Sequence, residues 1–110
     1  MKKIIYLLLL FSAFANAQIV NIPDVNFKTR LISLGVDSNS DGNIQNSEAS
    51  SIITLDLNYA NIADITGIES FVNLKTLYND HNYFPNLNLT ALLDMERLFC
   101  QWNEITTLNV

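Results

Sequence analysis

The chain has 110 residues, with 6 Lys+Arg against 11 Asp+Glu, and a formal net charge of −5 at pH 7. This acidic balance excludes a protein that binds nucleic acid through its phosphates, because such binding depends on Lys and Arg. The single cysteine excludes an intrachain disulfide, so an exported domain of this size must be stabilised by packing, by repetition or by a metal ion.

Residues 1–17 have the features of a secretory signal peptide. Lys2 and Lys3 precede an apolar run at residues 4–14, and Ala15-Asn16-Ala17 gives a small–x–small cleavage pattern. The alternative, a membrane anchor, is less favoured because the run is short for a span and polar sequence follows it. Cleavage after Ala17 removes two lysines, which leaves 4 Lys+Arg and a net charge near −7. We therefore expect a secreted or cell-surface protein with no transmembrane segment after cleavage.

Residues 18–51 read as a helix, a polar loop and a short second helix. Phe27, Leu31 and Leu34 recur at i, i+4 and i+7, which predicts one apolar helical stripe. Asp24 stands where an N-cap is needed, and Gly35 suits the C-terminal end of the helix. The second helix is predicted to begin near residue 48.

The loop at residues 37–48, DSNSDGNIQNSE, matches the calcium-binding pattern D-x-[DN]-x-[DN]-G-x5-E. Calcium is a hard ion that takes six to eight oxygen ligands, and alternate residues around a tight turn direct their oxygens to one point. The predicted ligands are Asp37, Asn39, Asp41, Asn43 and Glu48. The alternative is a polar turn without a metal, since Ser, Asn, Asp and Gly are common in turns.

This loop resembles EF-hand or dockerin-like loops, although dockerin modules carry two such loops and this chain has one. The resemblance implies a structural calcium ion that stabilises a cap formed by residues 18–51. With three formal ligand charges and an extracellular setting, we expect weak binding, on the order of 10⁻⁴–10⁻³ M.

Residues 52–110 are repetitive. The segments IITLDLNYANI, LKTLYNDHNYF and MERLFCQWNEI align, and their fourth-position leucines, Leu55, Leu77 and Leu98, are spaced by 22 and then 21 residues. A period of 20–29 residues with leucines and an asparagine at fixed positions is typical of leucine-rich repeats. Asn82 and Asn103 take the asparagine position in the second and third units. One such unit cannot bury its own apolar side, so the units are expected to stack around a shared core.

Here the sequence resembles secreted bacterial leucine-rich-repeat proteins of the internalin-like surface type. The stretches ADITGIESFVNLKTL and LTALLDMERLFCQWNEITTL carry the likeness. It implies an α/β fold: a leucine-rich-repeat solenoid with short parallel strands on its concave face, capped at the N-terminus by the helix–loop–helix. We expect about three repeats, truncated at the C-terminus, since Val110 falls within a repeat. Proteins of this kind are generally recognition or adhesion modules.

Two columns of outward-facing residues are rich in aromatic side chains. Alternation along each strand places them on the face opposite the leucines, and exposed aromatic patches mark interaction surfaces. The columns are Asp56/Tyr78/Phe99 and Tyr59/His81/Trp102. The alternative is that the rings only cover the sheet.

Catalysis is not expected. The only histidine, His81, is predicted to point outward and the only cysteine, Cys100, inward, which keeps a nucleophile and its base out of hydrogen-bond reach. The sequence therefore favours a non-catalytic extracellular module that binds a protein or a glycan on the face carrying the aromatic columns. The alternative function is a structural spacer or cap segment of a larger cell-surface repeat protein with no ligand of its own.

Overall fold

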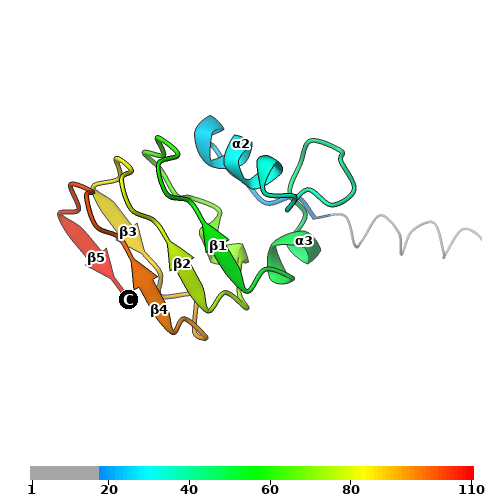
Figure 1. The fold of residues 1–110 in the computed structure, drawn as a ribbon. Coiled ribbons are helices and arrows are strands. Elements are labelled where there is room, and N and C mark those ends of the chain that lie inside the picture. The colour runs from blue at the N-terminus through cyan, green and yellow to red at the C-terminus, as the bar shows by residue number, and fades with distance from the viewer. Residues whose placement is uncertain (1–17) are drawn as a thin grey trace, which may run out of the picture.

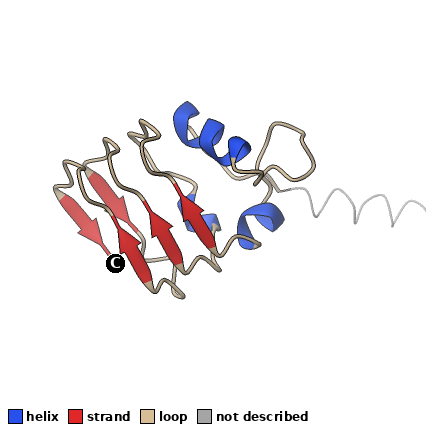
Figure 2. Ribbon diagram, in the orientation of Figure 1, coloured by secondary structure: helices blue, strands red, loops and turns tan. Residues whose placement is uncertain are grey.

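The computed structural model describes residues 18–110, and the predicted signal peptide lies outside the described residues. Two short α-helices come first and five three-residue strands follow them (Figures 1 and 2). The elements are α2 (Val25–Ser33), α3 (Asn46–Ser50), β1 (Thr54–Asp56), the 3₁₀ turn η1 (Ile68–Ser70), β2 (Thr76–Tyr78), β3 (Asn86–Asn88), β4 (Arg97–Phe99) and β5 (Thr107–Asn109). Within residues 18–110, no helix has the length and apolar character needed to cross a membrane.

Helix α2 begins and ends at the residues that the sequence predicts. The Asp24 carboxylate accepts the backbone N–H of Phe27 at 3.0 Å, which satisfies one of the free donors of the first turn. Gly35 follows the helix with φ at +83°, a left-handed conformation that glycine adopts without strain. Phe27 and Leu31 are buried as expected, but the prediction for Leu34 was wrong, because it ends the helix and is 44% exposed.

The strands form two parallel sheets. One has the order β1-β2-β4, and the other pairs β3 with β5. In the first sheet Leu55 pairs with Leu77 and Leu77 with Leu98, while Leu87 pairs with Leu108 in the second. The spacing of 22 and 21 residues therefore corresponds to the distance along the chain from one strand to its neighbour.

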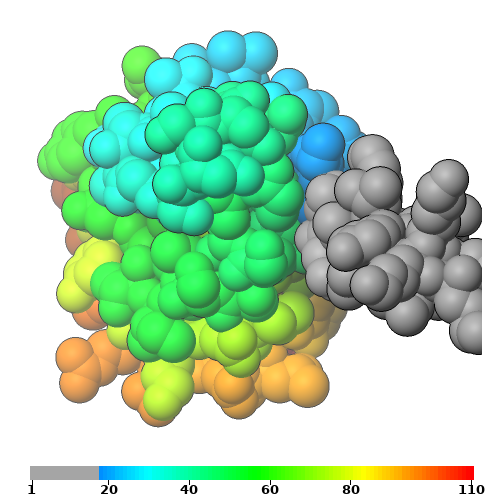
Figure 3. All heavy atoms as spheres, turned by 90° about the vertical axis from the view of Figure 1, so that its right-hand side faces the viewer, coloured from blue at the N-terminus to red at the C-terminus, as the bar shows by residue number. Residues whose placement is uncertain are grey.

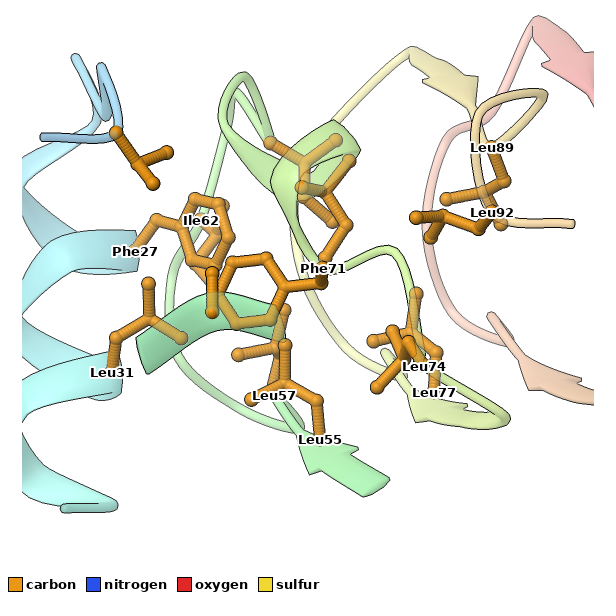
Figure 4. Close-up of a cluster of buried hydrophobic side chains, with 14 of the residues drawn as sticks. Phe27, Leu31, Leu55, Leu57, Ile62, Phe71, Leu74, Leu77, Leu89 and Leu92 are labelled. Atoms are coloured by element: carbon orange, nitrogen blue, oxygen red, sulfur yellow. The ribbon is translucent and has the colours of Figure 1, made fainter. Parts of the chain in front are cut away.

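The core runs between the two sheets and into α2 (Figure 4). Phe27 from α2 and Phe71 lie with ring centroids 6.5 Å apart, which joins the helix to the interior of the sheets. Leu55, Leu57 and Leu77 are at most 1% exposed, whereas Leu98 is only half-buried. At about 25 cal/mol per Å² of apolar surface removed from water, such burial supplies most of the stabilisation.

Residues of the N-terminal segment cover one end of the sheets. In Figure 3 the atoms of α2 and the following loop, coloured cyan to green, lie over that end. Asp24 accepts the N–H groups of Ala63 and Asp64 at 2.9 and 3.0 Å, so the residue that caps α2 also bonds to the chain that follows β1. Asn26 donates to the carbonyl oxygen of Asn61 at 2.9 Å.

The predicted α/β solenoid is corrected to a small, predominantly β domain. The described residues form two short sheets, and both α-helices lie before residue 51. Among the described residues after β1, the segments that return from one strand to the next contain no α-helix. Pro85 precedes alternating polar and apolar residues that form β3, and Gly67 at φ +108° begins a single 3₁₀ turn.

Candidate functional site

The outward-facing residues of the first sheet and of the turns that follow its strands form one surface, which we call the aromatic face. It contains all six predicted ligand-binding residues: Asp56, Tyr59, Tyr78, His81, Phe99 and Trp102. Tyr59 and Trp102 are 69% and 73% exposed, although such large rings are usually at least partly buried. The structure therefore brings these side chains to one surface. Alternation along the strands accounts for Asp56, Tyr78 and Phe99. Tyr59, His81 and Trp102 lie in the turns that follow the strands.

The rings of the aromatic face form two stacks. Tyr59 and His81 lie with centroids 4.2 Å apart, and His81 and Trp102 with centroids 5.5 Å apart, each pair with an interplanar angle of 13°. Tyr78 and Phe99 form the second stack, at 4.9 Å and 7°. His81 is the inner ring of the longer stack, and because a ring covers each of its faces it presents mainly its edge. Open ring faces belong to the ring at either end of a stack.

The first stack depends on an unusual backbone conformation. Tyr59, His81 and Trp102 have φ values of 55°, 57° and 58°. Positive φ is uncommon for residues with bulky side chains and costs on the order of 1–3 kcal/mol at each position. The N–H of Tyr59 donates to the carbonyl of Asp80 at 3.1 Å, and that of His81 to Gln101 at 3.0 Å, so adjacent turns are bonded to one another. Nothing in the sequence signals this conformation.

A column of polar residues accompanies the two stacks. Asn58, Asp80 and Gln101 directly precede Tyr59, His81 and Trp102 in the chain. The Asn58 side-chain oxygen accepts the N–H of Asp80, and the Asp80 carboxylate accepts the N–H of Gln101, both at 2.6 Å. These hydrogen bonds hold polar side chains beside the aromatic rings.

The predicted calcium loop closes on itself through hydrogen bonds. The Asp37 carboxylate accepts the N–H groups of Asp41 and Gly42 at 3.2 and 2.9 Å, and Gly42 turns the chain with φ at +83°. The Glu48 carboxylate reaches back across the loop to the N–H of Asn39 at 3.2 Å. The backbone N–H of Asn43 donates to the Asp41 carboxylate at 2.9 Å, while its side-chain oxygen accepts from Lys28 at 3.3 Å.

Backbone N–H groups of the loop already donate hydrogen bonds to the carboxylates of Asp37 and Glu48. Within residues 18–110, no group of three or more His, Cys, Asp or Glu side chains lies close enough together to hold a metal ion. The structure brings Asp37 and Asp41 into one turn and Glu48 opposite them, but it does not assemble a coordination shell.

Hydrogen bonds favour the ionised form of two of these acids. Burial raises the pKa of Glu48, but the hydrogen bonds from Gln45, Asn39 and Ser38 together outweigh it and hold the pKa below its ordinary value. The backbone N–H of Asn43 is the largest cause of the lowered pKa of Asp41. The carboxylates of Asp41 and Glu48 are therefore both charged at neutral pH.

Cys100 lacks the features of a nucleophile. Burial, and then the negative charge of Asp80, raise the pKa of the Cys100 thiol above its ordinary value. The thiolate is the reactive form, so these effects keep Cys100 protonated at neutral pH.

A cavity of about 600 Å³ lies away from the aromatic face, between residues 63–69 and residues 85–91. Several of its polar side chains are bonded within their own turns. Asp64 accepts from the N–H and hydroxyl of Thr66, and Asn88 accepts from both groups of Thr90. The cavity therefore lacks the convergent polar groups that mark a ligand site.

The solved structures similar to this chain include two from Clostridium perfringens. The first, "The structure of CBM51-2 and INT domains from Clostridium perfringens ZmpB", has a TM-score of 0.61 and 30% identity over 76% of this chain and 17% of that chain. The second contains CBM51-2 in complex with GlcNAc and the INT domains, with a TM-score of 0.60 and 30% identity over 74% of this chain and 17% of that chain. This chain thus spans about a sixth of the structures that it matches. Neither the family models nor the curated proteins give a match.

These similarities overturn the assignment to internalin-like leucine-rich-repeat surface proteins. The matching structures are of CBM51-2 and INT domains, and the described residues form a small β domain. The leucine period misled the assignment because any stack of short, regularly spaced parallel strands needs an apolar residue at a fixed position in each strand. A repeat of leucines therefore does not define one family.

Proposed function

We propose that this chain is a non-catalytic extracellular domain that binds a glycan on the aromatic face. The observation that carries the proposal is the pair of ring stacks ending in Phe99 and Trp102, with hydrogen-bonded polar side chains beside them. One of the similar structures contains CBM51-2 in complex with GlcNAc, which supports a sugar as the class of ligand.

The chemistry of the aromatic face suits a sugar. A pyranose has an apolar face of C–H groups, which packs on an aromatic ring, and a rim of hydroxyl groups, which hydrogen-bonds to polar side chains. Trp102 at the end of its stack provides a ring, and Asp80 and Gln101 provide acceptors and donors beside it.

Fluorescence tests this proposal directly, because Trp102 is the only tryptophan of the chain. Titration with a panel of mono- and oligosaccharides should change the Trp102 emission with a saturable dependence on concentration. Trp102→Phe, followed by calorimetry, should retain weaker binding, and Trp102→Ala should lose it while the protein stays folded. If no sugar in the panel binds and all variants fold normally, the spacer function is favoured instead.

We also propose that calcium binds the loop at residues 37–48 and stabilises it. The support is the match to the calcium pattern, together with a loop that already turns at Gly42 and carries the charged carboxylates of Asp41 and Glu48. Asp37, Asn39, Asp41, the Asn43 carbonyl and Glu48 would hold the ion. Its role would be structural, since the loop lies beside α2 and away from the aromatic face.

A further inference from the structure

A small pocket lies between α2 and the first ring of the longer stack. Its volume is about 220 Å³, and it is lined by Asn26, Thr29, Arg30, Ser33, Tyr59 and Ala60. His81 covers one face of the Tyr59 ring. Helix α2 lies on the side of β1 away from β2 (Figure 1), so the other face of the ring is on the side of this pocket.

Three polar side chains of the pocket, those of Asn26, Arg30 and Ser33, are held in place by hydrogen bonds. Arg30 donates to the carbonyl oxygen of Asn58, and Ser33 donates to the carbonyl oxygen of Arg30 at 2.7 Å. Asn26 is fixed by its bond to the carbonyl of Asn61. The guanidinium carries five N–H donors, so its bond to Asn58 leaves it able to donate to a ligand. Side chains fixed before binding lose little conformational freedom when a ligand arrives.

The charge of the pocket differs from that of the chain. The whole chain has 11 Asp+Glu against 6 Lys+Arg, yet the lining of this pocket contains an arginine and no acidic residue. Arginine binds carboxylates in a two-pronged geometry through charge-assisted hydrogen bonds. A pocket of this volume is below the range that drug-sized ligands occupy, and it suits a single ring.

We infer that this pocket binds one sugar ring that carries a carboxylate, with the ring packed on Tyr59 and the carboxylate on Arg30. This inference rests on the proposed function and adds the class of sugar and the residues of α2 that select it. Thr29 and Ser33 supply hydroxyl groups that hydrogen-bond to the hydroxyl groups of the sugar ring. The acidic sugar is bound at the helix-side end of the stack, and further sugars extend along the aromatic face toward Trp102.

The test compares methyl β-glucuronide with methyl β-glucoside, which differ only in the group at C6, by NMR titration of the folded chain. The glucuronide should bind about tenfold more tightly, since a hydrogen bond to a charged group is worth about that factor. Arg30→Gln should remove this preference. Because Arg30 also bonds to Asn58, a second variant is needed. Thr29→Glu, at an exposed position of α2, should weaken glucuronide binding more than glucoside binding.

Leu93→Glu is the matched control, because it adds the same charge at a position that is 88% exposed and lies outside the pocket. It should leave the preference unchanged. Equal affinity for the two sugars, or binding that survives Arg30→Gln and Thr29→Glu but is lost in Trp102→Ala, overturns the inference and leaves the proposed function standing. If neither these sugars nor a wider panel binds, both the inference and the proposed function fail.

Discussion

The side-chain amide of Asn82 donates to the carbonyl oxygen of Leu57, 2.8 Å away and 25 residues earlier in the chain. Its oxygen accepts the N–H groups of Ala60 and Ile62 at 3.2 and 3.0 Å. One buried side chain therefore satisfies three backbone groups of the turn that follows β1, which has Ala60 where the later units have asparagine.

Asn82→Ala should lower the free energy of unfolding by about 3 kcal/mol, because it leaves buried backbone groups without partners. The matched variant Asn103→Ala should lower the free energy of unfolding by about 1 kcal/mol. Asn103 is only partly buried, and although its amide donates to the carbonyl of Asn79, its side-chain oxygen has no hydrogen-bond partner among residues 18–110. Urea denaturation followed by circular dichroism measures both values. Equal losses would show that Asn82 does not hold the turn.

The leucines aligned across the first sheet should differ in their contribution to stability. Leu77 is 0% exposed. Leu77→Ala should lower the free energy of unfolding by about 3–5 kcal/mol, because less apolar surface is buried and a cavity is left in the core. Leu98→Ala should cost about 1–2 kcal/mol, because Leu98 is half-buried at the edge of the sheet. The same denaturation experiment gives both numbers. A cost for Leu98→Ala as large as that for Leu77→Ala would contradict the described core.

Calcium should raise the thermal stability of the chain if it binds the loop. With a dissociation constant near 10⁻³ M, about 10 mM free calcium stabilises the folded state by about 1.4 kcal/mol. Calorimetry with and without chelator measures the shift, and Glu48→Gln and Asp37→Asn should abolish it. Asp94→Asn, an exposed acid outside the loop, should leave the shift intact. An equal shift in all three variants would show that calcium acts elsewhere.

Stability should fall in acid, and Glu48 should contribute to the loss. The pKa of Glu48 in the folded chain lies below its ordinary value of 4.5, and that of Asp24 lies below 3.8. A carboxyl group whose pKa is lower in the folded state stabilises that state above its unfolded pKa, and this contribution disappears as the pH falls through the folded pKa. Melting temperatures of the wild type and Glu48→Gln, measured without calcium from pH 7 to pH 2, should converge below pH 4.5. A difference that stays constant down to pH 2 would contradict this origin.

Local signals in the sequence were enough to predict several parts of the structure. Asp24 and Gly35 predicted the ends of α2 because each acts within one turn: the Asp24 carboxylate accepts an N–H of the first turn, and Gly35, without a Cβ, adopts positive φ after the last. The spacing of Leu55, Leu77 and Leu98 predicted their alignment, since parallel strands in register repeat at the length of their connection. Asp56, Tyr78 and Phe99 followed from simple alternation with the buried leucines of the strands.

Other features depend on contacts that a sequence pattern does not encode. The pairing of β3 with β5 needs two strands 21 residues apart, whose alternation is only three residues long. Tyr59, His81 and Trp102 share positive φ values, and aromatic residues give no local sign of them. At Tyr59 and His81 the backbone N–H bonds to the adjacent turn. The family assignment was wrong because it treated a regular spacing of leucines as specific to leucine-rich-repeat proteins.

The most direct test of glycan binding at the aromatic face is a two-dimensional NMR titration of the ¹⁵N-labelled chain with the sugar that binds most tightly. The account predicts that shifts concentrate at the indole N–H of Trp102 and at the backbone amides of His81, Gln101 and Tyr59, while the amides around Asp64 and Thr90, beside the larger cavity, stay unchanged. Shifts confined to the amides around that cavity, with the signals of the aromatic face unmoved at saturation, would contradict it.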